Sequence, residues 1–147
     1  MPSDAADFAE ALIAGTSDAV IFADADGTIT RWNPGAARMF GYTAAEAISS
    51  SLDLIVPEAL RARHWHGYHE TMRTGRTRYG DGQILAVPAV RKDGSRLSVE
   101  FTVVAFTDPA GRMRGIGAIL KRQAVDPGYQ FTAELPVGPG SESRAGI

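Results

Sequence analysis

The sequence contains no cysteine among its 147 residues. This absence excludes disulfides, thiolate zinc sites, cysteine-ligated iron–sulfur clusters and any chemistry that forms a cysteinyl adduct. The chain also has no apolar run near the ~20 residues that span a bilayer. Its acidic first segment, Met1–Glu10, lacks the apolar stretch of a signal peptide. We therefore expect a cytoplasmic protein with no membrane partner.

The chain has little excess charge of either sign. Fifteen Lys and Arg residues against 17 Asp and Glu residues give a formal net charge of −2. A charge so nearly balanced gives no strong field to recruit nucleic acid, and we predict no nucleic-acid partner. The arginines between Arg61 and Arg78 are better explained as the solvated face of a helix.

Signatures of catalysis are also missing. Gly80-Asp81-Gly82 lacks the Gly-Lys-Ser/Thr that follows in a phosphate-binding loop, and no nucleophile elbow is present. The three histidines lie two, three and five residues apart on one predicted helix, which is poor spacing for a three-histidine zinc site. We expect no enzyme.

The first third of the chain predicts a helix followed by a hairpin. Phe8, Ala11 and Leu12 repeat at helical spacing within residues 4–14, which gives an amphipathic N-terminal helix. Residues 19–23 form an apolar strand, and the Asp-Gly of residues 24–27 supplies the turn to a second strand at 28–32.

The middle of the chain predicts helices with recognisable ends. Asn33-Pro34 opens a short helix that runs to Phe40. Thr43 and Glu46 have the spacing of a capping box, which starts a second short helix. A longer helix runs from about Val56 to Thr74, where Gly75 caps it.

The last part predicts three antiparallel strands, at residues 83–90, 97–105 and 113–121. Pro88 marks the first of these as an edge strand or a bulge. The fold class is therefore α+β, a five-stranded antiparallel sheet with short helices on one face. We expect three parts: an N-terminal helix at 1–15, a domain at 16–123, and a flexible tail rich in Pro, Gly and Ser at 124–147.

Four short motifs occur in a characteristic order along this pattern. They are the strand and turn at 18–27, the Ile-x-x-x-Asn-x-x-Ala stretch at 29–36, the Phe-Gly-Tyr step with its capping box at 40–46, and Arg-Lys-Asp-Gly at 91–94. This order resembles the PAS fold. The resemblance implies a sensor or pairing module that forms a homodimer and signals to a partner protein in trans.

One histidine is placed to face the sheet. At about 100° per residue, His64 shares the apolar side of the long helix, whereas His66 lies opposite and His69 lies to the side. Trp65 points about 100° away, so we expect it at the surface or in an interface. The residues that share the face of His64 are Leu60, Tyr68 and Thr71.

The segment Leu60–His64 resembles the Arg-x-x-His segment of haem-binding PAS sensors. The resemblance implies that His64 binds the iron of haem b and that the domain detects redox state or a diatomic gas (O2, CO or NO). No Met or Arg matches the family's distal position. The remaining pocket residues implied are Leu60, Gly67, Tyr68, Ile84, Leu85, Val99, Phe101 and Val103.

Three other interpretations stay open. In the first, the domain is a cofactor-free module that dimerises through residues 4–14, and His64 is a hydrogen-bonded histidine of its core. In the second, the pocket takes another small apolar ligand. Flavin is the third, and it is not expected: the chain has no cysteine for the adduct of a light-sensing flavin domain, and no residue pattern favours flavin bound without photochemistry.

Overall fold

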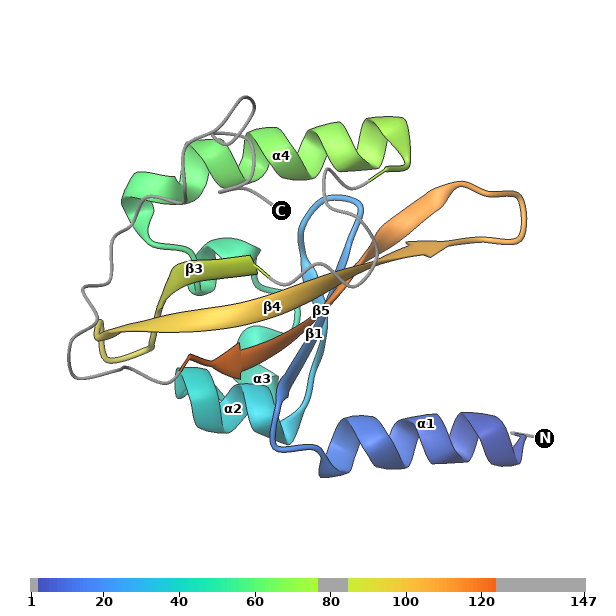
Figure 1. The fold of residues 1–147 in the computed structure, drawn as a ribbon, viewed down its shortest axis with the longest axis horizontal. Coiled ribbons are helices and arrows are strands. Elements are labelled where there is room, and N and C mark those ends of the chain that lie inside the picture. Colours follow the sequence, from blue (N-terminus) through green and yellow to red (C-terminus); the bar gives the residue numbers. More distant parts are fainter. Residues whose placement is uncertain (1–2, 77–84, 124–147) are drawn as a thin grey trace.

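The computed structural model describes residues 3–76 and 85–123. The described residues begin with a helix, continue through a hairpin and several helices, and finish with three strands (Figure 1). The elements are α1 (Asp4–Gly15), β1 (Ala19–Asp24), β2 (Ile29–Trp32), α2 (Pro34–Phe40), α3 (Ala44–Ala47), the 3₁₀ turns η1 (Leu52–Leu54) and η2 (Glu58–Leu60), α4 (Arg61–Thr74), β3 (Leu85–Val90), β4 (Arg96–Thr107) and β5 (Met113–Arg122).

The five strands form one antiparallel sheet in the order β2-β1-β5-β4-β3. This confirms the predicted five-stranded α+β fold. Pro88 lies on β3 opposite Ser98, and β3 is an edge strand as its proline predicts. The strand predicted from residue 83 is described only from Leu85, because Gln83 and Ile84 lie outside the described residues, as does the predicted tail.

The helix ends follow from local hydrogen bonds. Thr43 and Glu46 form both bonds of the predicted capping box, and Gly75 adopts the left-handed conformation that ends α4. The long helix was predicted from Val56, but α4 begins at Arg61. The amide of Leu60 bonds to the carbonyl of Pro57, so the first turn is a 3₁₀ turn, a common form at a helix start.

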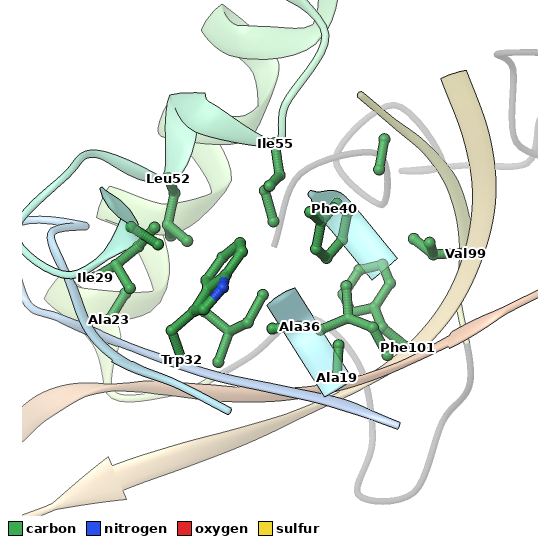
Figure 2. Close-up of a cluster of buried hydrophobic side chains, with 14 of the residues drawn as sticks. Ala19, Ala23, Ile29, Trp32, Ala36, Phe40, Leu52, Ile55, Val99 and Phe101 are labelled. Atoms are coloured by element: carbon green, nitrogen blue, oxygen red, sulfur yellow. The ribbon is translucent and has the colours of Figure 1, made fainter. Parts of the chain in front are cut away.

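The core lies between the helices and the inner face of the sheet. Leu97, Val99 and Phe101 alternate inward along β4, while the residues between them are partly exposed. Figure 2 shows Trp32, Phe40 and the β4 side chains converging with residues of η1 and β1. The labelled members of this cluster are Ala19, Ala23, Ile29, Trp32, Ala36, Phe40, Leu52, Ile55, Val99 and Phe101.

Helix α1 is capped by Ser3 but buries none of its residues. Phe8 is 66% exposed and Leu12 55% exposed. The helix is attached through the side-chain amide of Asn33, which donates to the carbonyl of Ile13, and through an ion pair between Glu10 and Arg31. Its apolar side is therefore largely open to solvent. None of the described helices is long and apolar enough to cross a membrane.

Candidate functional site

Helix α4 carries the candidate site on its inner face. His64 is 4% exposed, and the same face buries Gly67, Tyr68 and Thr71. His66 and His69 are exposed. The helical arithmetic predicted this arrangement of the three histidines. Within the described parts of the chain, no three His, Asp or Glu side chains come together as a metal site would require.

His64 closes one side of an apolar cavity of about 80 Å³ between α4 and the sheet. Leu60 comes from the same helical segment, Val87 from β3, and Val99 and Phe101 from β4. Among the described lining residues, His64 is the single polar side chain. The cavity is therefore an apolar chamber with one imidazole in its wall.

Both ring nitrogens of His64 are buried and have no hydrogen-bond partner among residues 3–76 and 85–123. Burial lowers the pKa of His64 from 6.5 to about 4; the charge of Asp53 opposes this shift and that of His69 adds to it. The imidazole is therefore neutral at pH 7. A hydrogen-bonded core histidine would need a partner, and the described residues supply none. Neutral imidazole with a free nitrogen is the form that binds a metal or accepts a hydrogen bond.

Trp65 corrects the prediction that it lies at the surface or in an interface. It is half-buried, its indole N–H donates to Asp53 Oδ1 at 2.7 Å, and its ring fills the space beside Gly27. The helix angle alone gives 100° of separation from His64. The helix angle could not predict that η1 and the β1–β2 turn pack against this side of α4 and bury part of the Trp65 ring.

Tyr68 links the site helix to the hairpin. Its hydroxyl donates to the backbone carbonyl of Asp24, and its ring centroid lies 5.9 Å from that of His64. Burial, followed by the charges of Asp24 and Asp26, raises the pKa of Tyr68 above its ordinary value. The phenol therefore stays protonated as a donor at neutral pH.

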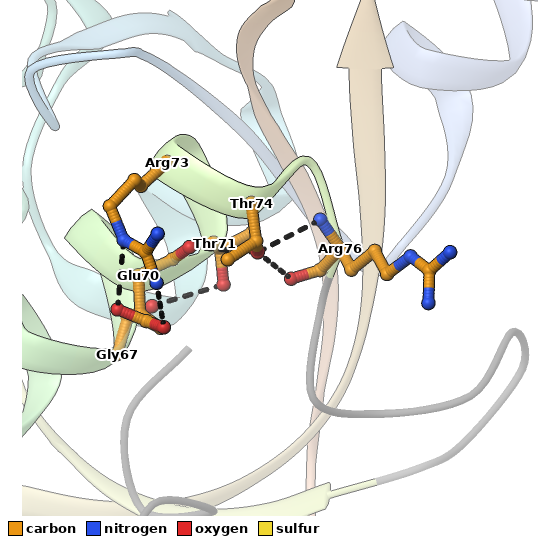
Figure 3. Close-up of polar contacts among 6 residues, drawn as sticks. All are labelled: Gly67, Glu70, Thr71, Arg73, Thr74 and Arg76. Atoms are coloured by element: carbon orange, nitrogen blue, oxygen red, sulfur yellow. Dashed lines mark hydrogen bonds and ion pairs between the residues drawn. The ribbon is translucent and has the colours of Figure 1, made fainter.

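Polar side chains in the last turns of α4 bond to one another and to the helix backbone, on the buried side as well as on the exposed side. Arg73 Nη2 donates to Glu70 Oε1 at 2.6 Å, and Thr71 Oγ1 donates to the carbonyl of Gly67 at 3.0 Å (Figure 3). Thr74 also bonds within this turn, to the carbonyls of Glu70 and Arg76. Arg73 and Arg76 are exposed, as expected for a solvated helix face. Arg61 is only partly exposed and donates to the carbonyls of Asp53 and Val56, and Arg78 lies outside the described residues.

The remaining predicted pocket residues divide into three groups. Leu60, Val99 and Phe101 line the cavity with His64, whereas Gly67 and Tyr68 are buried on α4 but do not line it. Val103 does not line it, because β4 loses its burial toward this end, and from Val104 its side chains are exposed. Ile84 lies outside the described residues, and the backbone of Leu85 pairs with Phe101.

Sequence reasoning missed most of the cavity wall. The missed residues come from β1, from η1 and the two residues after it, from β3 and from β5: Ile21, Leu52, Ile55, Val56, Val87, Pro88, Ala89, Ala118 and Leu120. For β3 a signal was present, because the strand predicted at residues 83–90 contains Val87, Pro88 and Ala89. The others become neighbours of His64 only through the strand order.

The model of the PAS fold family matches residues 7–122. The chain belongs to the PAS family. A PAS domain of a Colwellia psychrerythraea protein has a TM-score of 0.71 at 18% identity, over 82% of this chain and 98% of that one. An RNA-binding light-oxygen-voltage receptor has a TM-score of 0.66 at 19% identity, over 79% of this chain and 32% of that one. At these identities the likeness shows the fold alone.

Two curated proteins are similar to this PAS domain in sequence. The sensor protein FixL of Bradyrhizobium diazoefficiens is 30% identical over 86 residues, which are 58% of this chain and 17% of FixL. An uncharacterized protein of Azorhizobium caulinodans is 33% identical over 94 residues, which are 63% of this chain and 13% of that protein. The match thus spans less than a fifth of either relative.

Proposed function

We propose that this PAS domain is a haem-based sensor of redox state or of a diatomic gas (O2, CO or NO), in which His64 would bind the iron. The observation that carries the proposal is the buried, neutral His64 imidazole, both of whose nitrogens lack a described partner. Imidazole is a common axial ligand of haem iron. The similarity of the segment to sensor protein FixL supports a sensory role.

The residues present fit haem chemically, but the cavity requires opening. Its wall is apolar, as a porphyrin requires, and its one polar group is the iron-binding type. However, about 80 Å³ is well below the roughly 300–1,000 Å³ of a typical ligand pocket. The proposal therefore includes a separation of α4 from β3 and β4 as the group enters. Bound haem would supply an iron that binds the gas or changes oxidation state.

An absorption spectrum tests the proposal. The protein is purified for this purpose from cells given a haem precursor. We expect an intense Soret band that shifts with carbon monoxide. His64→Ala should abolish or alter the band, whereas His66→Ala, which changes an exposed histidine on the same helix, should keep it. A protein that stays colourless when titrated with haem would rule the proposal out. The absorption spectrum of flavin would show that the bound cofactor is flavin and not haem.

A second candidate function, homodimerisation, is favoured by a different surface. Large apolar side chains are exposed on α1 and on the outer face of the sheet, and a groove of about 420 Å³ lies between them. Exposed apolar patches of this kind mark interaction sites. The exposed fractions are 66% for Phe8, 55% for Leu12, Val104 and Phe106, and 43% for Ile119.

Sedimentation analysis tests this second function. If the face pairs two copies, Phe106→Glu should convert a dimer to a monomer, because it places a charge in an apolar interface. Ile48→Glu is the matched control, since Ile48 is also exposed, at 41%, but does not line the groove. A wild-type protein that is monomeric at all concentrations would contradict homodimerisation.

The output of either function would pass to a partner protein in trans, in the cytoplasm. The PAS family assignment supports a sensory or pairing role rather than catalysis. The absence of cysteine from the sequence fits a reducing compartment.

A further inference from the structure

The His64 ring contacts two aromatic rings and has no hydrogen-bond partner among the described residues. Histidines that bind metals usually donate their second ring N–H to a carboxylate or carbonyl, which fixes the ring plane. No described residue does this for His64. Instead the His64 ring meets the Trp65 ring edge-on, with centroids 4.8 Å apart and planes at 74°, and the Tyr68 ring at 5.9 Å.

Trp65 is itself held on several sides. Its N–H donates to Asp53 Oδ1 at 2.7 Å. A Cβ added to Gly27 would lie 2.1 Å from two atoms of the six-membered ring, so the indole occupies the place of a side chain. The His69 ring stacks on it with centroids 5.8 Å apart. The Trp65 ring is therefore contacted from η1, from the β1–β2 turn and from His69.

Asp53, in turn, is anchored in the turn η1. Its amide bonds to Ser51 Oγ at 3.1 Å, and its carboxylate lies 3.9 Å from the Arg61 guanidinium. Arg61 also donates to the carbonyls of Asp53 and Val56. A continuous set of contacts therefore runs from η1 through Asp53 and Trp65 to the His64 ring.

We propose that Trp65, fixed by Asp53, is a positioning residue that sets the His64 ring plane for its ligand. The iron-binding part of this inference rests on the haem function proposed above. Release of the indole would let the imidazole turn about its side-chain bonds, which weakens its bond to the iron. Loss of a supporting contact around a metal ligand commonly costs 10–100-fold in affinity.

The rival explanation is that Trp65 only contributes to the general packing of α4. The chain offers a matched control, because Trp32 is the other tryptophan. Trp32 is 5% exposed, its N–H donates to the carbonyl of Tyr42 at 3.0 Å, and its ring packs on Phe40 and Tyr42. Trp32→Phe thus removes an indole and its hydrogen bond, but this indole makes its ring contacts with Phe40 and Tyr42 and not with His64.

The first experiment uses the haem-free protein and the NMR signals of the His64 ring. We expect one sharp set of ring signals in the wild type, and broadened or multiple sets in Trp65→Phe and Asp53→Ala. Asp53→Asn retains a carbonyl oxygen as acceptor and should keep the wild-type pattern, as should Trp32→Phe. Sharp, unshifted signals in Trp65→Phe, or equal broadening in Trp32→Phe, would overturn the proposal.

The second experiment uses haem-loaded protein, with the iron–histidine stretching frequency and the rate of haem loss as readouts. Trp65→Phe and Asp53→Ala should shift the iron–histidine frequency and speed haem loss about 10-fold or more. Asp53→Asn should keep the wild-type frequency and the wild-type rate of haem loss. If haem binds through His64 but all variants match the wild type, the positioning inference is wrong. If no variant, wild type included, binds haem, the haem function fails, and the NMR result alone decides the positioning role.

Discussion

Gly27 meets two structural requirements at once, one of the turn in which it lies and one of Trp65 on helix α4. It lies in the β1–β2 turn with φ +80°, in the left-handed region that glycine adopts without strain. Its missing Cβ also leaves the space that the Trp65 ring fills. The sequence predicts a turn glycine here from the Asp-Gly pair. It does not reveal the second requirement, which comes from a residue 38 positions later in the chain.

Gly27→Ala should destabilise the protein more than Gly94→Ala does. Gly94 has a similar φ of +86°, but a Cβ there would meet nothing within 4 Å. Backbone strain alone should cost about 1–2 kcal/mol at Gly94. At Gly27 the displaced indole should add about 1–3 kcal/mol. Urea unfolding of the two variants measures the difference, and equal losses would mean that Trp65 moves aside freely.

Elements with local start and stop signals were predicted well, and the cavity was not. The capping box at Thr43 and the cap at Gly75 depend on residues three or four positions apart, so the sequence displays them directly. The inward side of α4 follows from helical periodicity. By contrast, Tyr68 reaches Asp24 across 44 positions. Such contacts depend on the strand order, which no local pattern encodes.

Asn33 joins three elements through its side chain. Its Oδ1 accepts from the amides of Val20 and Ala36, at 2.8 and 2.9 Å, and so caps α2 and holds β1. Its Nδ2 donates to the carbonyls of Ile13 and Asp18, at 2.8 and 3.0 Å. Asn33 is 3% exposed, so water cannot replace these four bonds readily. The orientation of α1 depends on this amide.

Asn33→Ala should reduce the free energy of unfolding by about 2–4 kcal/mol, since it removes a helix cap and leaves buried backbone groups unpaired. It should also free α1, which we expect to appear as faster amide hydrogen exchange in residues 4–15. Thr30→Ala on the neighbouring strand is the control, because Thr30 is exposed and makes one long bond of 3.4 Å. Unchanged exchange in α1 would show that the Glu10–Arg31 pair suffices to hold the helix.

At the scale of the whole molecule, one sheet separates two surfaces of different kinds. The inner face carries the cavity at His64, and the outer face carries the groove beside α1. Adjacent residues of β5 serve the two sides, with Leu120 in the cavity wall and Ile119 in the groove, while Ala118 borders both. The thickness of a single strand therefore separates the proposed ligand pocket from the proposed pairing surface.

The buried His64 should make the stability of the haem-free protein depend on pH. Its pKa is about 4 in the folded protein against 6.5 as the ordinary value. Between these two values the unfolded chain binds a proton that the folded protein does not. Stability is therefore fully present above about pH 6.5 and falls as the pH is lowered toward 4. The full shift corresponds to about 3 kcal/mol.

Urea unfolding between pH 4 and pH 7 measures this loss. His64→Leu removes the titrating group and should flatten the dependence in that window. His66→Leu, at an exposed position of the same helix, should retain it. Hydrogen bonds and nearby cations also lower the pKa values of Glu46, Asp93 and Asp108, so their contribution is lost as the pH falls below the ordinary values of 4.5 for Glu and 3.8 for Asp, equally in all three proteins. The contribution of these carboxyl groups therefore cancels in the comparison. Equal pH dependence of the unfolding free energy in wild type and His64→Leu would show that a partner stabilises the protonated imidazole in the folded protein.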